Sequence, residues 1–187
     1  MPRAGLDTAT VVAAGAELAD QVGLNRLTMG LLAERLGVRT PSLYKHVDGQ
    51  EDLVRHIATL ATAQAADAVG TAVQGLAGRD ALAAALHAFR SLVITHPGRY
   101  AATTGMEPTG PEDPMALASQ RLFDVFRAVL RGYDIDEADT DHALRMIRSL
   151  CHGFATLEAA GGFKWSADID TSFEWLIDFT DQGLRAM

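Results

Sequence analysis

Polar and basic side chains gather between residues 39 and 46, in a composition typical of contact with nucleic acid. Hydroxyl and imidazole groups donate hydrogen bonds to phosphate oxygens, and basic side chains add positive charge. Basic and hydroxyl groups also read base edges in the major groove, and the proline ring offers methylene surface to a thymine methyl group. We expect an outward-facing set made of Thr28, Arg39, Thr40, Pro41, Ser42, Tyr44, Lys45 and His46.

Residues 28–47 have the pattern of a helix-turn-helix that could hold these side chains. Thr28 suits the N-cap of a helix over 29–36, and Gly37 suits its end. Pro41 is favoured in the first turn of a second helix that ends near residue 47. In DNA-binding versions of this motif the second helix enters the major groove. The internal contacts between the two helices are expected from Ala33, Leu36, Val38 and Leu43.

An αα-hairpin inside any helical bundle would give a similar pattern. The adjacent exposed side chains Tyr44, Lys45 and His46 favour the DNA-binding interpretation, because a plain bundle has little need for them.

Residues 7–60 resemble the N-terminal DNA-binding domain of the tetracycline-repressor (TetR) family of transcription regulators. The resemblance rests on LTM at 27–29, LAERLGV at 32–38, PSLYKHV at 41–47 and EDL at 51–53. It implies a homodimer that binds a palindromic operator and usually represses. It also implies a second, variable domain that usually binds a small effector.

The same resemblance implies roles for single residues. Thr28 and Tyr44 fall where family members contact phosphates, and His46 falls where members contact the same DNA strand. Residues 39–42 with Lys45 fall where members meet bases or flanking backbone. Gln50 stands where many members have a phosphate-binding lysine, and it donates only a neutral hydrogen bond. With few cations near the groove, we expect modest affinity and a shallow salt dependence.

The whole chain is expected to be all-α, with a DNA-binding domain over 1–50 and a ligand-binding and dimerisation domain over 51–187. No stretch shows sustained strand alternation. A capping box of Asp48 and Glu51 is expected to start the helix 51–69 that links the two domains, and Asp170 to cap the last helix. The pattern predicts about nine helices, near 7–22, 29–36, 41–47, 51–69, 80–96, 97–104, 113–131, 137–160 and 171–184.

Two segments of the second domain resemble a subgroup named for a Trp-His-Gly motif. They are HPGRY at 96–100 and CHGF at 151–154, where Cys151 replaces the tryptophan. An effector site between bundle helices would be mostly apolar with a few polar groups, although ordinary core packing explains the same residues. The candidate lining residues are Phe89, Tyr100, Met106, Phe123, Phe126, Met146, His152, Phe154 and Trp165, with Arg148, Thr156 and Glu158 as further polar contacts.

The last two helices carry apolar stripes at helical spacing, which could pack on the core and on a second chain at once. The resemblance also implies a four-helix interface here, and a monomeric bundle is the alternative. The candidate interface residues are Leu144, Ile147, Cys151, Phe173, Leu176, Ile177 and Leu184.

Composition and motifs exclude several other functions. The net charge is −8, yet residues 1–60 hold six basic and seven acidic side chains, so most of the acidity lies in the second domain. The single cysteine and the scattered histidines 87, 96, 142 and 152 predict no metal site. We find no catalytic or nucleotide-cofactor motif, and therefore expect no enzyme and no cofactor. Neither a membrane span nor a signal peptide is visible, so we expect a cytoplasmic protein.

We interpret the protein as a sequence-specific transcription regulator, a homodimeric repressor that a small molecule releases from DNA. A ligand would favour a spacing of the recognition helices that no longer fits successive major grooves, about 34 Å apart. One alternative is a ligand-binding or interaction protein of the same fold with lost DNA binding. Another is an activator, or a regulator without an effector.

Overall fold

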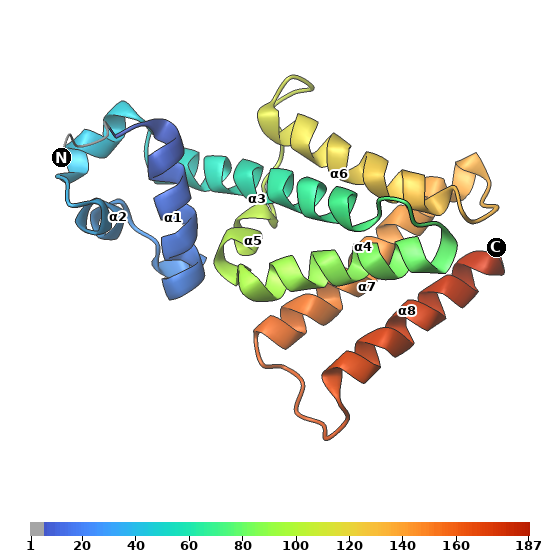
Figure 1. Ribbon diagram of the computed structural model, residues 1–187. Helices are drawn as coiled ribbons and strands as arrows, with labels where there is room; N and C mark the ends of the chain where they lie inside the picture. Colours follow the sequence, from blue (N-terminus) through green and yellow to red (C-terminus); the bar gives the residue numbers. More distant parts are fainter. Residues whose placement is uncertain (1–5) are drawn as a thin grey trace.

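The computed structural model describes residues 6–187, and every regular element in that range is helical (Figure 1). This confirms the all-α prediction. Residues 1–5 belong to the predicted first domain and to the segment inspected for a signal peptide, and they lie outside the described residues. The elements are α1 (Thr8–Val22), η1 (Leu24–Arg26), α2 (Met29–Leu36), η2 (Thr40–Lys45), α3 (Gln50–Ala72), α4 (Gly78–Thr95), α5 (Pro97–Thr103), α6 (Pro114–Leu130), α7 (Glu137–Ala159) and α8 (Ile169–Arg185).

The N-terminal domain packs α1, α2, η2 and the start of α3 around one apolar core. Each of these elements contributes a fully buried side chain, namely Val11, Leu32, Leu43 and Leu53. Burial of a leucine or valine side chain contributes roughly 1.5–3 kcal/mol. The predicted boundary after residue 50 falls at the first residue of α3, but the first turns of α3 pack into the N-terminal core.

The second helix of the predicted helix-turn-helix, η2, is a 3₁₀ helix and not the α-helix predicted near residues 41–47. The N–H groups of Ser42 and His46 donate to the carbonyl oxygens of Arg39 and Leu43, three residues back, at 2.8 and 2.9 Å. The 3₁₀ form is used for such short pieces, and Pro41 at the start has no N–H to give. The tighter winding still leaves Leu43 fully buried.

The start of α3 also differs from the predicted capping box. The N-cap is Gly49, at φ 128°, a backbone conformation that favours glycine. The backbone N–H of Asp48 donates to the carboxylate of Asp52 at 2.9 Å, and Glu51 does not take that role. The turn that leads into α3 is therefore closed by the side chain of Asp52.

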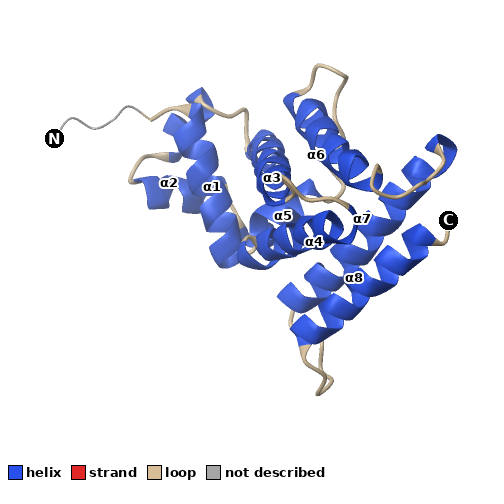
Figure 2. Cartoon of the chain, turned by 45° about the vertical axis from the view of Figure 1, so that its right-hand side comes forward, coloured by secondary structure: helices blue, strands red, loops and turns tan. Residues whose placement is uncertain are grey.

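The C-terminal domain contains α4 to α8 and the second half of α3. Figure 1 shows α3 running out of the N-terminal domain beside α6, with α4 and α7 beneath them. In Figure 2, α8 lies on the outside of the molecule, where it packs on α4 and α7. No described helix is both long enough and apolar enough to cross a membrane.

Helix α8 begins two residues before the predicted start. Asp168 and not Asp170 caps it, because the Asp168 carboxylate accepts a hydrogen bond from the Thr171 N–H at 2.8 Å. The Asp170 carboxylate instead accepts from the guanidinium of Arg90 on α4, at 2.7 Å. The predicted cap is thus part of a contact between helices.

Arg90 joins three helices of the C-terminal domain. Its guanidinium donates to both carboxylate oxygens of Glu158 on α7, at 2.7 and 2.6 Å, and lies 4.7 Å from the ring centroid of Phe173 on α8. Hydrogen bonding to Glu158 raises the pKa of Arg90 further above its usual value. Because Arg90 is buried, this pair is shielded from solvent.

We expect Arg90→Ala to lower the free energy of unfolding by about 3–5 kcal/mol, because Glu158 would keep a largely buried and unpaired charge. Arg79→Ala is the matched control, since Arg79 binds Asp178 at an exposed site and such pairs contribute roughly 0–1 kcal/mol. Urea denaturation at one fixed protein concentration measures both. Equal losses in the two variants would contradict the role given to Arg90.

Candidate functional site

The helix-turn-helix is held by caps at both ends of α2. The Thr28 hydroxyl accepts a hydrogen bond from the Leu31 N–H at 3.2 Å, and Gly37 ends the helix in the left-handed conformation at φ 65°. The next residue, Val38, donates its N–H to the Ala33 carbonyl at 3.0 Å. This closure of the α2 end fixes the turn into η2 and therefore the direction in which η2 presents its side chains.

The structure places the predicted DNA-contacting residues on one stretch of surface from the start of α2 through η2. Tyr44 is 54% exposed although it follows the fully buried Leu43. The predicted residues divide into an exposed group, Thr28, Arg39, Pro41, Tyr44 and Lys45, and a half-buried group, Thr40, Ser42 and His46.

Gln50 makes a contact inside the domain that the sequence did not predict. Its side-chain amide donates to the Leu27 carbonyl oxygen at 2.9 Å, and so it ties the start of α3 to the entry of α2. One of its two amide hydrogens is thereby used inside the domain, and the contact of Gln50 with DNA stays a prediction.

The charges on this surface are positive and unpaired. Among the described residues, neither Arg39 nor Lys45 forms an ion pair, whereas Arg35 on α2 binds Glu17 on α1 at 2.6 Å. Unpaired cations beside hydroxyl groups are what phosphate contact requires.

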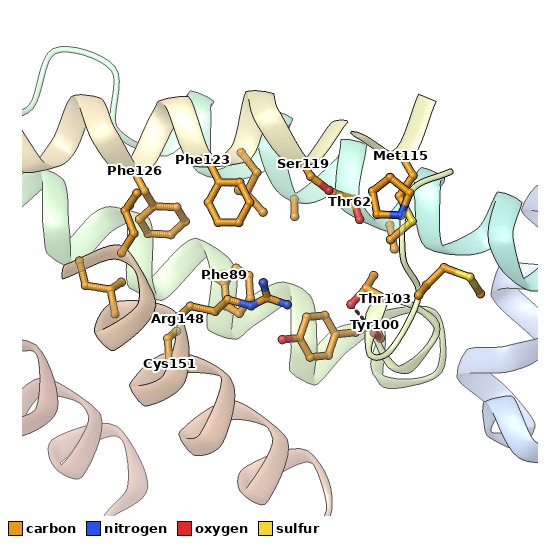
Figure 3. A pocket seen from close by; sticks show the side chains of 17 residues that line it. Thr62, Phe89, Tyr100, Thr103, Met115, Ser119, Phe123, Phe126, Arg148 and Cys151 are labelled. Carbon is orange, nitrogen blue, oxygen red and sulfur yellow. Dashed lines mark hydrogen bonds between the residues drawn. The ribbon is translucent and has the colours of Figure 1, made fainter. Parts of the chain in front are cut away.

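A cavity of about 280 Å³ lies in the C-terminal domain between α3, α4, α5, α6 and α7 (Figure 3). Its wall is mostly apolar and aromatic, with a few hydroxyl groups and one charge. The lining residues are Ala61, Thr62, Ala65, Phe89, Tyr100, Thr103, Met106, Pro108, Met115, Ser119, Leu122, Phe123, Phe126, Leu144, Ile147, Arg148 and Cys151.

Five predicted lining residues, Phe89, Tyr100, Met106, Phe123 and Phe126, do line this cavity. The other four predicted residues do not. Phe154 packs between Phe163 and Phe173, and Trp165 is 78% exposed beside Phe163. Met146 packs half-buried against the core. His152 lies behind Tyr100, to which it is hydrogen-bonded.

The small and hydroxyl-bearing part of the cavity wall was not predicted from the sequence. Ala61, Thr62 and Ala65 come from one face of α3, and Ser119 comes from α6. Small residues one turn apart on α3 leave the space that the cavity occupies. That spacing was visible in the sequence, but alanines are so frequent in this chain that it carried little information.

Burial controls the ionisation of two groups on the wall. It raises the pKa of the Tyr100 phenol to about 12 and that of the Cys151 thiol to about 12. Both groups are neutral at physiological pH. The Tyr100 hydroxyl lies 2.6 Å from Nδ1 of His152, so α5 and α7 are joined behind the cavity wall. Among the described residues there is no cluster of three groups that could hold a metal ion.

The predicted dimer-interface residues are mostly core residues of one protomer. Phe173, Ile177 and Leu184 of α8 are at most 2% exposed, and Leu144, Ile147 and Cys151 of α7 are buried beside the cavity. Only Leu176 is half-buried. The prediction is wrong for the six buried residues, because packing within the chain already covers their side chains.

A different apolar surface lies on the outer side of α7 and α8. Trp175 and Phe179 are 72% and 59% exposed, and their rings stack with centroids 5.9 Å apart. Leu157 on α7 is also exposed. We call Leu157, Trp175 and Phe179 the outer α7–α8 face. Exposed apolar side chains of this size are candidates for contact with a partner.

A helix-turn-helix with a polar and basic outer face, joined through α3 to a helical domain that holds a cavity, is typical of one-component transcription regulators. Comparison with known families identifies the particular one. Residues 11–57 match the model of bacterial regulatory proteins of the tetR family, and residues 82–180 match the Tetracyclin repressor-like C-terminal domain. The chain therefore belongs to the TetR family, whose members are transcription regulators and not enzymes.

Relatives extend over nearly the full chain. The HTH-type transcriptional regulator Rv0681 of Mycobacterium tuberculosis is 36% identical over 97% of this chain and 80% of its own. The HTH-type transcriptional regulator YobS of Bacillus subtilis is 30% identical over 94% of this chain and 91% of its own. The resemblance of the C-terminal domain to the Trp-His-Gly subgroup stays a prediction.

Solved structures share the fold. A TetR variant from Acinetobacter baumannii in complex with minocycline has a TM-score of 0.73 at 25% identity, over 96% of each chain. BioQ with its double-stranded DNA operator has a TM-score of 0.70 at 22% identity, over 98% of this chain and 100% of that one.

Proposed function

We propose that the protein is a homodimeric repressor that binds a palindromic operator through η2 and is released by a small molecule in the C-terminal cavity. The observation that carries this proposal is the exposed surface formed by Arg39, Tyr44 and Lys45. Neither cation forms an ion pair among the described residues, and the buried Leu43 fixes this segment to the core. The BioQ complex with its operator supports DNA binding by a chain of this fold, and the minocycline complex supports a small-molecule site.

The dimer is proposed to form through the outer α7–α8 face. A two-fold axis would place this face of one protomer against the same face of its partner and cover Leu157, Trp175 and Phe179 at once. The result would be a four-helix interface made of α7 and α8 from both chains. This arrangement keeps the helix pair that the sequence indicated but uses its opposite side.

Helix α5 is proposed to transmit the ligand signal, because it contacts both the cavity and the DNA-binding domain. Tyr100 lines the cavity, while its neighbour Arg99 donates through Nε to the Asp20 carboxylate of α1 at 2.8 Å. Arg99 also donates to Gln64 of α3 at 3.0 Å, and His96 lies 3.1 Å from Asp20. A ligand that moves α5 therefore moves α1 and α3.

The release mechanism is proposed to be a shift between two arrangements of the dimer. One arrangement presents the two η2 elements to successive major grooves, about 34 Å apart, and the other does not. A ligand changes this equilibrium only by its differential affinity for the two arrangements. Helix α3 carries the movement, since it runs from the N-terminal core to the cavity wall.

We expect Tyr44→Ala and Lys45→Ala each to weaken operator binding by roughly 1–3 kcal/mol, about 5–150-fold, because each removes one contact to DNA. Lys45→Ala should also make the salt dependence shallower by about one ion if Lys45 binds a phosphate. Fluorescence anisotropy, at several salt concentrations and with an operator obtained by selection from random-sequence duplex DNA, measures both effects.

Arg131→Ala is the control for these variants. Arg131 is exposed at the end of α6, and its replacement also removes one positive charge. It should leave operator affinity unchanged. Full affinity in both Tyr44→Ala and Lys45→Ala would rule out η2 as the recognition element.

A further inference from the structure

We propose that the cavity takes a compact, largely apolar carboxylate, and that the carboxylate group binds the guanidinium of Arg148. This inference rests on the proposed function, since it names the chemical class of the ligand for the same cavity. The argument comes from the charge, the polar groups and the size of the wall.

Arg148 is the only charged side chain on the wall, and no acidic residue is among the lining residues. In Figure 3 its guanidinium extends from α7 into the space between Tyr100 and the phenylalanine rings of α6. Among the described residues, Arg148 forms neither an ion pair nor a hydrogen bond. Because no described residue neutralises its charge, the Arg148 guanidinium is available to bind an anionic ligand.

The other arginines around this domain's interior are paired. Arg90 binds Glu158, Arg99 binds Asp20, and Arg55 lies 3.6 Å from Asp113. Arg148 differs because it faces an apolar cavity instead of a carboxylate. It remains open to solvent on one side, so its charge stays hydrated in the empty protein.

The remaining polar groups fit a carboxylate without competing for Arg148. The Tyr100 phenol stays protonated and hydrogen-bonded to His152, so it places no negative charge beside the guanidinium. The Thr62 and Thr103 hydroxyls donate to the carbonyl oxygens of Ala58 and Tyr100 and therefore offer mainly acceptor lone pairs to the cavity. Arg148 is thus the principal donor group for a ligand anion.

The size and the apolar surface of the cavity describe the rest of the ligand. A volume of about 280 Å³ lies just below the usual range of about 300–1,000 Å³ for ligand pockets, which indicates a small ligand. Phe89, Tyr100, Phe123 and Phe126 give the wall an aromatic character. A guanidinium binds a carboxylate through two parallel hydrogen bonds, whereas it repels an ammonium group and gains less from a hydroxyl group.

Isothermal titration calorimetry with the full-length protein in the absence of DNA tests the proposal. The probes are decanoate, decan-1-ol and decylammonium, which differ only in the head group, and the pair 1-naphthoate and 1-naphthamide. We expect at least one carboxylate to bind about tenfold or more tightly than its neutral counterpart, and decylammonium to bind most weakly.

The variant Arg148→Gln should remove the preference for the carboxylate while it leaves binding of decan-1-ol unchanged. Arg145→Gln, one turn away on the exposed side of α7, is the matched control and should keep the preference. Thermal melting verifies that both variants fold. The proposal is overturned if no carboxylate binds, if the neutral probes bind equally well, or if Arg148→Gln keeps the preference.

Addition of the bound carboxylate to the operator complex separates this inference from the proposed function. Release of DNA by the carboxylate supports both. Binding of the carboxylate without release keeps the ligand class and contradicts ligand-relieved repression. Release of DNA by the neutral probe alone, with no carboxylate binding, supports the repressor function and overturns the ligand class.

Discussion

Replacement of both Trp175 and Phe179 by glutamate is expected to convert the protein to folded monomers that no longer bind operator at concentrations that saturate the wild type. The two side chains are 72% and 59% exposed and make few contacts inside the protomer, so the fold should tolerate the change. Four glutamates would meet across a two-fold interface, two from each chain, and their repulsion and desolvation oppose association. Sedimentation velocity and anisotropy measure the two effects.

A single operator half-site offers about half of the contacts of a palindrome, which is why the monomer should bind so much more weakly. Leu117→Glu is the control, because Leu117 is a similarly exposed apolar residue on α6. It should remain dimeric and bind operator normally. An unchanged sedimentation coefficient of the double variant would remove the outer α7–α8 face as the interface.

Phe173→Ala provides a contrast on the same helix. Phe173 is completely buried and packs on Arg90 and Phe154, so its truncation should lower the free energy of unfolding by about 3–5 kcal/mol. Loss of folding, rather than clean dissociation into monomers, separates a core position of α8 from the outer face.

Gly98→Ala is the second substitution with a large expected effect. It changes the contact between α5 of the C-terminal domain and α1 of the N-terminal domain. A Cβ atom at Gly98 would lie 1.9 Å from the carbonyl oxygen of Ala19 and 2.5 Å from the backbone nitrogen of Asp20. Both are backbone atoms of α1, so α5 must move away and weaken the hydrogen bonds that Arg99 makes to Asp20. We expect a loss of about 3 kcal/mol or more in unfolding free energy.

Urea denaturation of Gly98→Ala measures this loss, and Gly30→Ala is its control. Gly30 lies in α2, where an added Cβ would meet only the Thr28 hydroxyl at 3.9 Å. That substitution should be neutral or slightly stabilising, because alanine is favoured over glycine in helices. A Gly98→Ala protein as stable as the wild type would contradict the close approach of α5 to α1.

Helix periodicity and capping residues predicted much of the fold. Thr28 and Gly37 correctly bounded α2, and Pro97 correctly started the short helix α5. The 3₁₀ form of η2 was not predictable from these signals, because Pro41 is equally suitable for the first turn of either helix type. Asp170 was expected to cap α8, but Asp168 does so, and Asp170 binds Arg90 in a contact between helices that local sequence does not reveal.

The exposed residues of η2 were easier to predict from the sequence than the residues of the dimer interface, for a physical reason. The positions of the exposed η2 residues follow from the short-range pattern around Leu43, so local sequence was sufficient. The apolar stripe of α8 indicates which side chains are buried, but it does not indicate whether the same chain or a partner covers them. Phe173 and Ile177 were therefore assigned to the dimer, whereas the exposed Trp175 on the other side was overlooked.

Selection of random-sequence duplex DNA by the purified protein tests the central claim most directly, with Tyr44→Ala in parallel at low and at near-physiological salt. We predict a palindromic consensus with half-sites about one helical turn apart, enriched by the wild type and lost in the variant. Absence of enrichment even at low salt, in protein that mass spectrometry shows to be free of bound small molecules, would contradict operator binding and favour a ligand-binding protein of the same fold.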